Sequence, residues 1–114
     1  MGVGMPASLL LQRFGQIVAD VFGEIPYHVG SSISVKSGWR DVDVRLILSD
    51  ADYEAQGFGD PLNPHSNKKW VALVLIFSAL GKEMTGLPID FQIQQQTASA
   101  KFDGIRSALF VVGE

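Results

Sequence analysis

Apolar residues recur at helical spacing over residues 6–23, and five of them fall on one face of the predicted helix. The five residues are Leu10, Phe14, Ile17, Val18 and Val21. Apolar positions at i, i+4, i+7 and i+8 are typical of an amphipathic helix with one buried face. Pro6 suits the first turn of such a helix, and Gly23 suits its carboxyl end.

A second helix is predicted over residues 67–85, with Ser66 or Asn67 as its cap and Gly86 and Pro88 at its end. Its main apolar stripe contains Trp70, Leu73, Val74, Phe77, Leu80 and Met84. A second apolar surface contains Val71, Leu75, Ile76 and Ala79. A helix that is apolar on two sides is buried on two sides. In so short a chain, the second side indicates an interface with another subunit, either a homodimer or a partner protein.

Alternation of apolar and polar residues predicts strands over residues 41–48 and 88–95. Aromatic and β-branched residues predict a shorter strand over 25–29, and the alternation over 32–40 favours a strand or hairpin arm. Because successive strand side chains point to opposite faces, Asp41 and Asp43 share one face of their strand. Asp90 lies on the polar face of its own strand.

The remaining segments carry weaker patterns. Residues 49–66 contain several glycine and proline breaks and predict a long loop, whereas 98–107 predict a short helix. Residues 108–112 are apolar and predict a last strand or a docked tail. Together these elements predict one domain over residues 1–114. Its expected fold class is α/β (α+β), with a small mixed sheet flanked by helices.

Composition narrows the chemistry. The chain has 114 residues, a net charge of −3 and a pI near 5.2, so we expect no strong binding to duplex nucleic acid. It has no cysteine and only two histidines, which points any metal site toward a hard, oxygen-ligated cation. Residues 1–6 lack the basic region of a signal peptide, and the longest apolar run, 70–80, is too short to span a membrane. We therefore expect a cytoplasmic protein with no membrane partner.

One constellation of residues indicates phosphate chemistry. Gly30 and Ser31 follow a predicted strand, where backbone N–H groups can approach a phosphate closely. Asp41 and Asp43 are two residues apart on one strand face, with Cα atoms about 6.6 Å apart. That spacing suits two divalent ions about 3.5–4 Å apart. Asp90, between Ile89 and Phe91, can complete a three-carboxylate site for Mg²⁺ or Mn²⁺.

This arrangement resembles the DNA-polymerase-beta-like nucleotidyltransferase superfamily, and in particular its minimal members. The resemblance covers roughly residues 10–95. It rests on Gly30-Ser31 after a strand, Asp41-Val42-Asp43 nine residues later, and an acid flanked by apolar residues at position 90. The sequence departs from the family pattern in the alternating, serine-rich stretch 32–38, and it has no C-terminal helical subdomain that would read a base.

The resemblance implies a nucleotidyltransferase-like fold and transfer of a nucleotidyl group from an NTP to a hydroxyl acceptor. Asp41, Asp43 and Asp90 would be the catalytic, metal-binding residues. Gly30, Ser31 and Ser32 would bind the nucleotide phosphates, and Arg40 or Lys36 would supply positive charge. Which NTP and which acceptor are used does not follow from these residues.

Other interpretations of the same residues remain open. The same residues also fit a second hypothesis, an inactive module of the same fold acting as a binding, antitoxin-like or homodimeric subunit. A third and weaker one is a metal-dependent phosphoryl hydrolase that uses the same three acids. Asp41 and Asp43 also fit a solvent-facing strand surface, and Arg45 shares their face, which favours an ion pair. His28, just before the Gly-Ser turn, fits a partly buried structural role better than a catalytic one.

Overall fold

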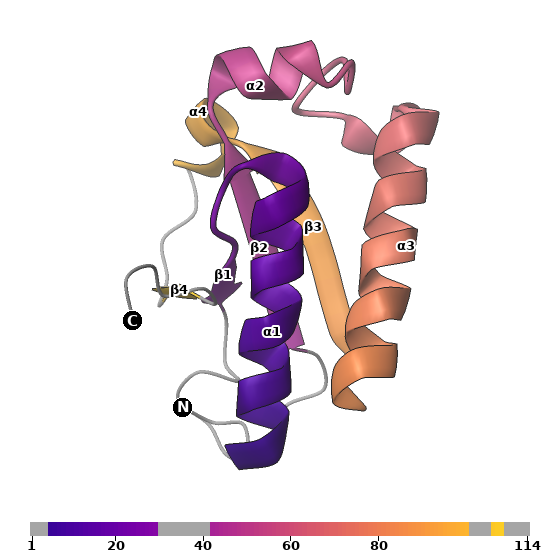
Figure 1. Cartoon of the computed structure of the whole chain (residues 1–114). Helices are drawn as coiled ribbons and strands as arrows, with labels where there is room; N and C mark the ends of the chain where they lie inside the picture. The colour runs from indigo at the N-terminus through magenta and orange to yellow at the C-terminus, as the bar shows by residue number, and fades with distance from the viewer. Residues whose placement is uncertain (1–4, 30–41, 101–105, 109–114) are drawn as a thin grey trace.

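The computed structural model describes residues 5–29, 42–100 and 106–108, and nine elements lie in these ranges (Figure 1). In chain order they are α1 (Met5–Phe22), β1 (Tyr27–Val29), β2 (Val42–Leu48), α2 (Asp50–Ala55), η2 (Pro64–Ser66), α3 (Lys68–Thr85), β3 (Ile89–Gln95), α4 (Gln96–Ser99) and β4 (Arg106–Ala108). The predicted fold class, a small mixed sheet with flanking helices, is confirmed at that level. Neither long helix, α1 nor α3, is apolar enough to cross a membrane, and the same is true of the other helices described.

The described strands form a mixed four-stranded sheet in the order β3-β2-β1-β4. β1 is antiparallel to both of its neighbours, whereas β2 and β3 are parallel along their whole lengths. Parallel pairing requires a crossover, and α3 supplies it by returning the chain to the other end of the sheet. The carboxyl ends of β2 and β3 therefore lie together, as do their amino ends.

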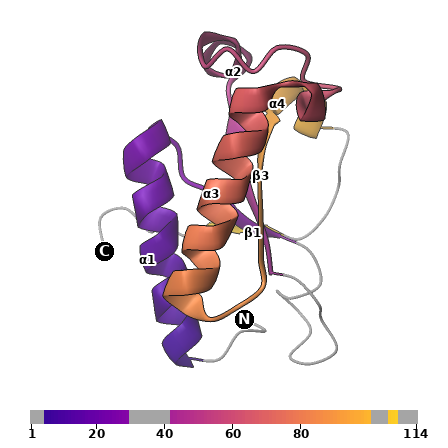
Figure 2. The same ribbon diagram turned by 90° about the vertical axis from the view of Figure 1, so that its right-hand side faces the viewer.

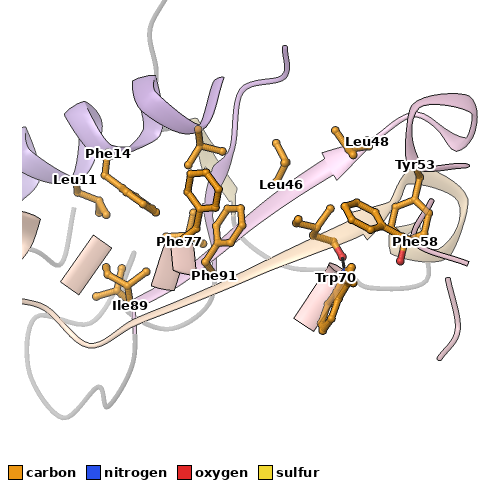
Figure 3. Packing of buried hydrophobic residues seen from close by; sticks show 14 residues of the cluster. Leu11, Phe14, Leu46, Leu48, Tyr53, Phe58, Trp70, Phe77, Ile89 and Phe91 are labelled. Atoms are coloured by element: carbon orange, nitrogen blue, oxygen red, sulfur yellow. Dashed lines mark hydrogen bonds between the residues drawn. The ribbon is translucent and has the colours of Figure 1, made fainter. Parts of the chain in front are cut away.

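Both long helices lie on the same face of the sheet, as the view along the sheet shows (Figure 2). The strand residues that face them are buried: His28 on β1, Val42, Val44, Leu46 and Leu48 on β2, and Ile89, Phe91 and Ile93 on β3. The rings of Phe14, Phe77 and Phe91 meet in the core, with centroids 6.1 Å apart for Phe14–Phe91 and 5.5 Å apart for Phe77–Phe91 (Figure 3). The opposite face of the sheet carries the half-buried polar side chains.

Helix α3 begins and ends as its sequence predicts, and it also covers the outer edge of β3. Asn67 caps it by accepting a hydrogen bond from the Trp70 backbone N–H, and Gly86 ends it with a φ of 72°. Trp70 Nε1 donates to the carbonyl oxygen of Ile93, and Ser78 Oγ accepts from the backbone N–H of Phe91. An edge strand exposes unpaired backbone groups, so these two bonds close part of that edge.

The structure corrects three expectations. The predicted loop 49–66 contains a helix, α2, because Ser49 caps it by accepting from the Asp52 N–H, and a 3₁₀ turn, η2. The predicted helix 98–107 is wrong: α4 ends at Ser99, and residues 106–108 form a strand paired with β1. On α1, Phe14 and Val18 are buried as predicted, but Leu11 is buried in place of Leu10, and Leu10 and Val21 are 38% and 59% exposed.

Candidate functional site

The half-buried sheet face brings together Asp43 and Asp90, which are far apart in the sequence. β2 and β3 are parallel, and their register pairs Asp43 directly with Asp90. Residues paired in this way on adjacent strands have Cα atoms about 5 Å apart and side chains on the same face. Two of the three predicted carboxylates are thus neighbours, near the amino ends of their strands.

Arg45 lies between these two carboxylates. Its Nη2 is 3.6 Å from Asp43 Oδ1 and 3.4 Å from Asp90 Oδ2. Its Nη1 donates to the backbone carbonyl of Asp90 at 2.8 Å, which fixes the position of the guanidinium. The ion pair predicted from the shared face of Asp43 and Arg45 is confirmed. Because one nitrogen contacts both acids, the two carboxylates lie within reach of a single cation.

The local sequence explains why these charged groups occupy a half-buried face. In β2 the valines before and after Asp43 are buried, so Asp43 and Arg45 point the other way. In β3, Ile89 and Phe91 are buried on either side of Asp90 in the same manner. The Arg45 side chain is 16% exposed, and those of Asp43 and Asp90 are 31% and 39% exposed. Water therefore screens the charges of these three side chains only in part. The positive charge of Arg45 offsets the repulsion between the two carboxylates.

The other predicted site residues lie outside the described part of the chain. These residues are Asp41, Gly30, Ser31, Ser32 and Arg40. Within the described ranges, no group of three or more histidine, cysteine, aspartate or glutamate side chains is arranged to hold a metal ion. The chemistry of the pair Asp43 and Asp90 nevertheless suits a hard divalent cation, because both donors are carboxylate oxygens.

A cavity of about 420 Å³ opens farther along the same face, at the carboxyl ends of β2 and β3. It is lined by Glu24, Tyr27, Ile47, Ser49, Gln96, Ser99 and Ala100. Tyr27 pairs directly with Arg45, and Ile47 lies two residues beyond Arg45, so both share the face of Asp43. Asp43 and Ile47 are four positions apart along β2, a distance of about 13 Å. The cavity and the carboxylate pair are therefore two ends of one surface.

Sequence patterns gave no sign of this cavity. Its lining comes from three separate stretches of the chain, and only the pairing of β1 with β2 places Tyr27 beside Ile47. The alternation within β1 does assign Tyr27 to the polar face, since His28 is buried. The position of Tyr27 on the polar face is thus the one feature of the cavity that strand alternation can indicate.

His28 belongs to the core instead of the site. It pairs with Val44 and shares the buried face of that residue, opposite Asp43 and Arg45. Burial lowers the pKa of the imidazole below its ordinary value of 6.5 and favours the neutral form. The structural role predicted for His28 agrees with this position.

Comparison with known proteins gives no assignment of function, so a proposed function rests on the geometry of the candidate site. No protein-family model, curated protein or solved structure matches this chain.

Proposed function

We propose that this protein catalyses Mg²⁺-dependent transfer of a nucleotidyl group from an NTP to a hydroxyl acceptor. The observation that supports the proposal is the direct pairing of Asp43 with Asp90 on parallel strands, with one cationic group held between their carboxylates. Two such acids on one half-buried sheet face, with a third predicted at position 41, form the ligand set that a phosphoryl-transfer metal site requires. The sequence resemblance to minimal nucleotidyltransferases rests on the same acids.

In this proposal Asp41, Asp43 and Asp90 hold the metal, and Mg²⁺ or Mn²⁺ would supply neutralisation of phosphate charge. Asp90 would also accept the proton of the attacking hydroxyl, whose oxygen bonds to the α-phosphorus as the bond to the departing pyrophosphate breaks. Arg45 keeps the two carboxylates in place before substrate binds, through its bonds to both strands. Gly30, Ser31, Ser32 and Arg40 bind the phosphates.

The cavity beside Tyr27 and Ile47 takes the nucleoside part of the substrate. It lies on the same face as the carboxylates and offers a ring, an aliphatic wall and polar groups from Glu24, Ser49 and Gln96. Sites for small molecules combine apolar walls with a few polar groups in this way. A nucleotide whose phosphates lie near Asp43 would place its base toward this end of the sheet.

Metal binding gives the first test. Mn²⁺ is expected to broaden the amide NMR signals of Asp43 and Asp90, and Asp43→Asn is expected to abolish the effect. Asp20→Asn, at an exposed position of α1, is the matched control and should behave like the wild type. Incubation with labelled NTPs and candidate acceptors then distinguishes nucleotidyl transfer from simple hydrolysis by its products. Absence of Mn²⁺ binding at millimolar concentration would contradict the metal site.

A second candidate is a non-catalytic module, and the position of Arg45 favours it. A guanidinium that already contacts both carboxylates can neutralise them without any metal. Under this alternative the wild type binds no Mn²⁺, whereas Arg45→Met gains binding because the two acids are left without their cation. Under the enzymatic proposal the wild type binds Mn²⁺ itself.

A further inference from the structure

Eight residues of α3 are exposed: Lys69 and Lys82 flank a stripe whose six residues follow a symmetric pattern. The six residues of the stripe are Lys68, Ala72, Leu75, Ile76, Ala79 and Glu83. The steps between them are four, three, one, three and four residues, so the spacing is the same in both directions along the helix. The two largest, Leu75 and Ile76, are 65% and 60% exposed and occupy the centre. Such steps place all six on one helical stripe, about 22 Å long.

This symmetry matches an antiparallel pair of identical helices. When a second copy of α3 is turned about a two-fold axis between positions 75 and 76, Leu75 meets Ile76 of the second copy. Ala72 then meets Ala79 of the second copy, and two small residues allow the helix axes to approach closely. Lys68 meets Glu83 of the second copy, so each end of the stripe holds a pair of opposite charges. A two-fold interface must be self-complementary, and this face is.

The charges at the two ends of α3 also favour antiparallel pairing. The first turn of α3 contains no acidic residue and begins with Lys68 and Lys69, which is unfavourable for the helix dipole. Antiparallel pairing brings Glu83 of the second copy to this amino end, together with the adjacent Lys82, which faces position 69. Lys69 is turned aside, because its Nζ donates to the Gln56 carbonyl at 2.7 Å and lies 5.7 Å from the centre of the Phe58 ring. Lys68 therefore remains to pair with the incoming acid.

We propose that two copies of this chain associate through α3, as an antiparallel helix pair centred on Leu75 and Ile76. α3 is the outermost element on its side of the molecule, with α1 and β3 behind it (Figures 1 and 2). The carboxylates Asp43 and Asp90 lie on the opposite face of the sheet, so the pairing leaves the candidate site open. The proposal is independent of the enzymatic function.

Sedimentation velocity over a concentration series tests the interface. The wild type is expected to show a monomer–dimer equilibrium, and Leu75→Glu is expected to be monomeric throughout. Thermal unfolding by circular dichroism serves as the folding control, since position 75 is exposed. A wild type that is monomeric up to millimolar concentration, or a Leu75→Glu variant that still dimerises, would overturn the proposal.

Charge reversal tests the antiparallel geometry. Lys68→Glu alone and Glu83→Lys alone each place like charges at both ends and should weaken dimerisation about tenfold or more. An equimolar mixture of the two variants restores opposite charges at both ends, so heterodimers should form with nearly wild-type affinity. The double variant Lys68→Glu/Glu83→Lys should also dimerise. In a parallel pair, each position would face the same position of the other copy, so like charges would already meet in the wild type. Neither single variant would then weaken dimerisation relative to the wild type, and that result would overturn the antiparallel geometry.

Discussion

Gly81 of α3 lies against Ile89 of β3 so closely that a β-carbon at position 81 would be 2.9 Å from Ile89 Cγ1 and 3.2 Å from Ile89 Cβ. This contact sets how near the crossover helix lies to the strand that carries Asp90. Because Ile89 is β-branched, its side chain has few alternative rotamers into which it can move. Glycine at this helical position is therefore a requirement of packing.

Gly81→Ala is expected to destabilise the protein, although alanine favours helix by about 1 kcal/mol over glycine. Overpacking costs about 1–3 kcal/mol and exceeds that gain. Chemical denaturation of Gly81→Ala, Ile89→Ala and the double variant measures the coupling. The double variant should be more stable than the sum of the single changes predicts; additive effects would refute the steric explanation.

Trp70→Phe is expected to lower the free energy of unfolding by about 1–3 kcal/mol. The variant removes the 2.9 Å hydrogen bond from the indole Nε1 to the Ile93 carbonyl, which lies in the buried interior (Figure 3). Leu62→Ala, at a side chain that is 71% exposed, is the control and should change stability by less than about 0.5 kcal/mol. Equal losses in both variants would show that the buried bond contributes nothing.

Protonation of His28 is expected to destabilise the fold. Burial lowers its pKa below 6.5 in the folded protein, so the unfolded chain binds the proton more readily. The contribution of neutral His28 to stability is thus complete above pH 6.5 and declines as the pH falls toward the folded-state pKa. Unfolding free energies at pH 7.5 and pH 5.5 should differ more for the wild type than for His28→Gln. An identical pH dependence in the two proteins would contradict this origin.

Arg45→Met is expected to destabilise the protein by about 1–2 kcal/mol, because Asp43 and Asp90 then repel each other without their shared cation. The loss should decrease at high salt, which screens the repulsion. Arg13→Met, at an exposed position of α1, provides the matched control and should have little effect. Thermal unfolding at 20 mM and 500 mM NaCl makes the comparison, and a loss that does not depend on salt would point to packing instead of charge.

The sequence predicted correctly the features that depend only on residues within a single helix or strand. The alternation in β2 and β3 assigned Val42 and Val44 to the core and Asp43 to the other face, as observed. Asn67 and Gly86 fixed the ends of α3 through bonds within a few residues of the chain. Of the predicted second surface of α3, Leu75, Ile76 and Ala79 are exposed together, because helical spacing determines which residues share a face, whereas Val71 is half-buried against the core.

Tertiary structure decided the features that depend on which strands meet. Residues 106–108 form a strand only because β1 offers them an edge, a pairing between segments far apart in the chain that local propensity does not contain. The parallel register that places Asp43 opposite Asp90 likewise depends on the crossover through α3, and the cavity beside Tyr27 depends on the pairing of β1 with β2. Within β2, β3 and α3 the sequence alone therefore determined which side chains share a face, since that follows from the period of each element, whereas packing decided that Leu11 of α1 is buried and Val21 is exposed. Which of them become neighbours was decided by the sheet, because strand order and register arise from packing of the whole domain.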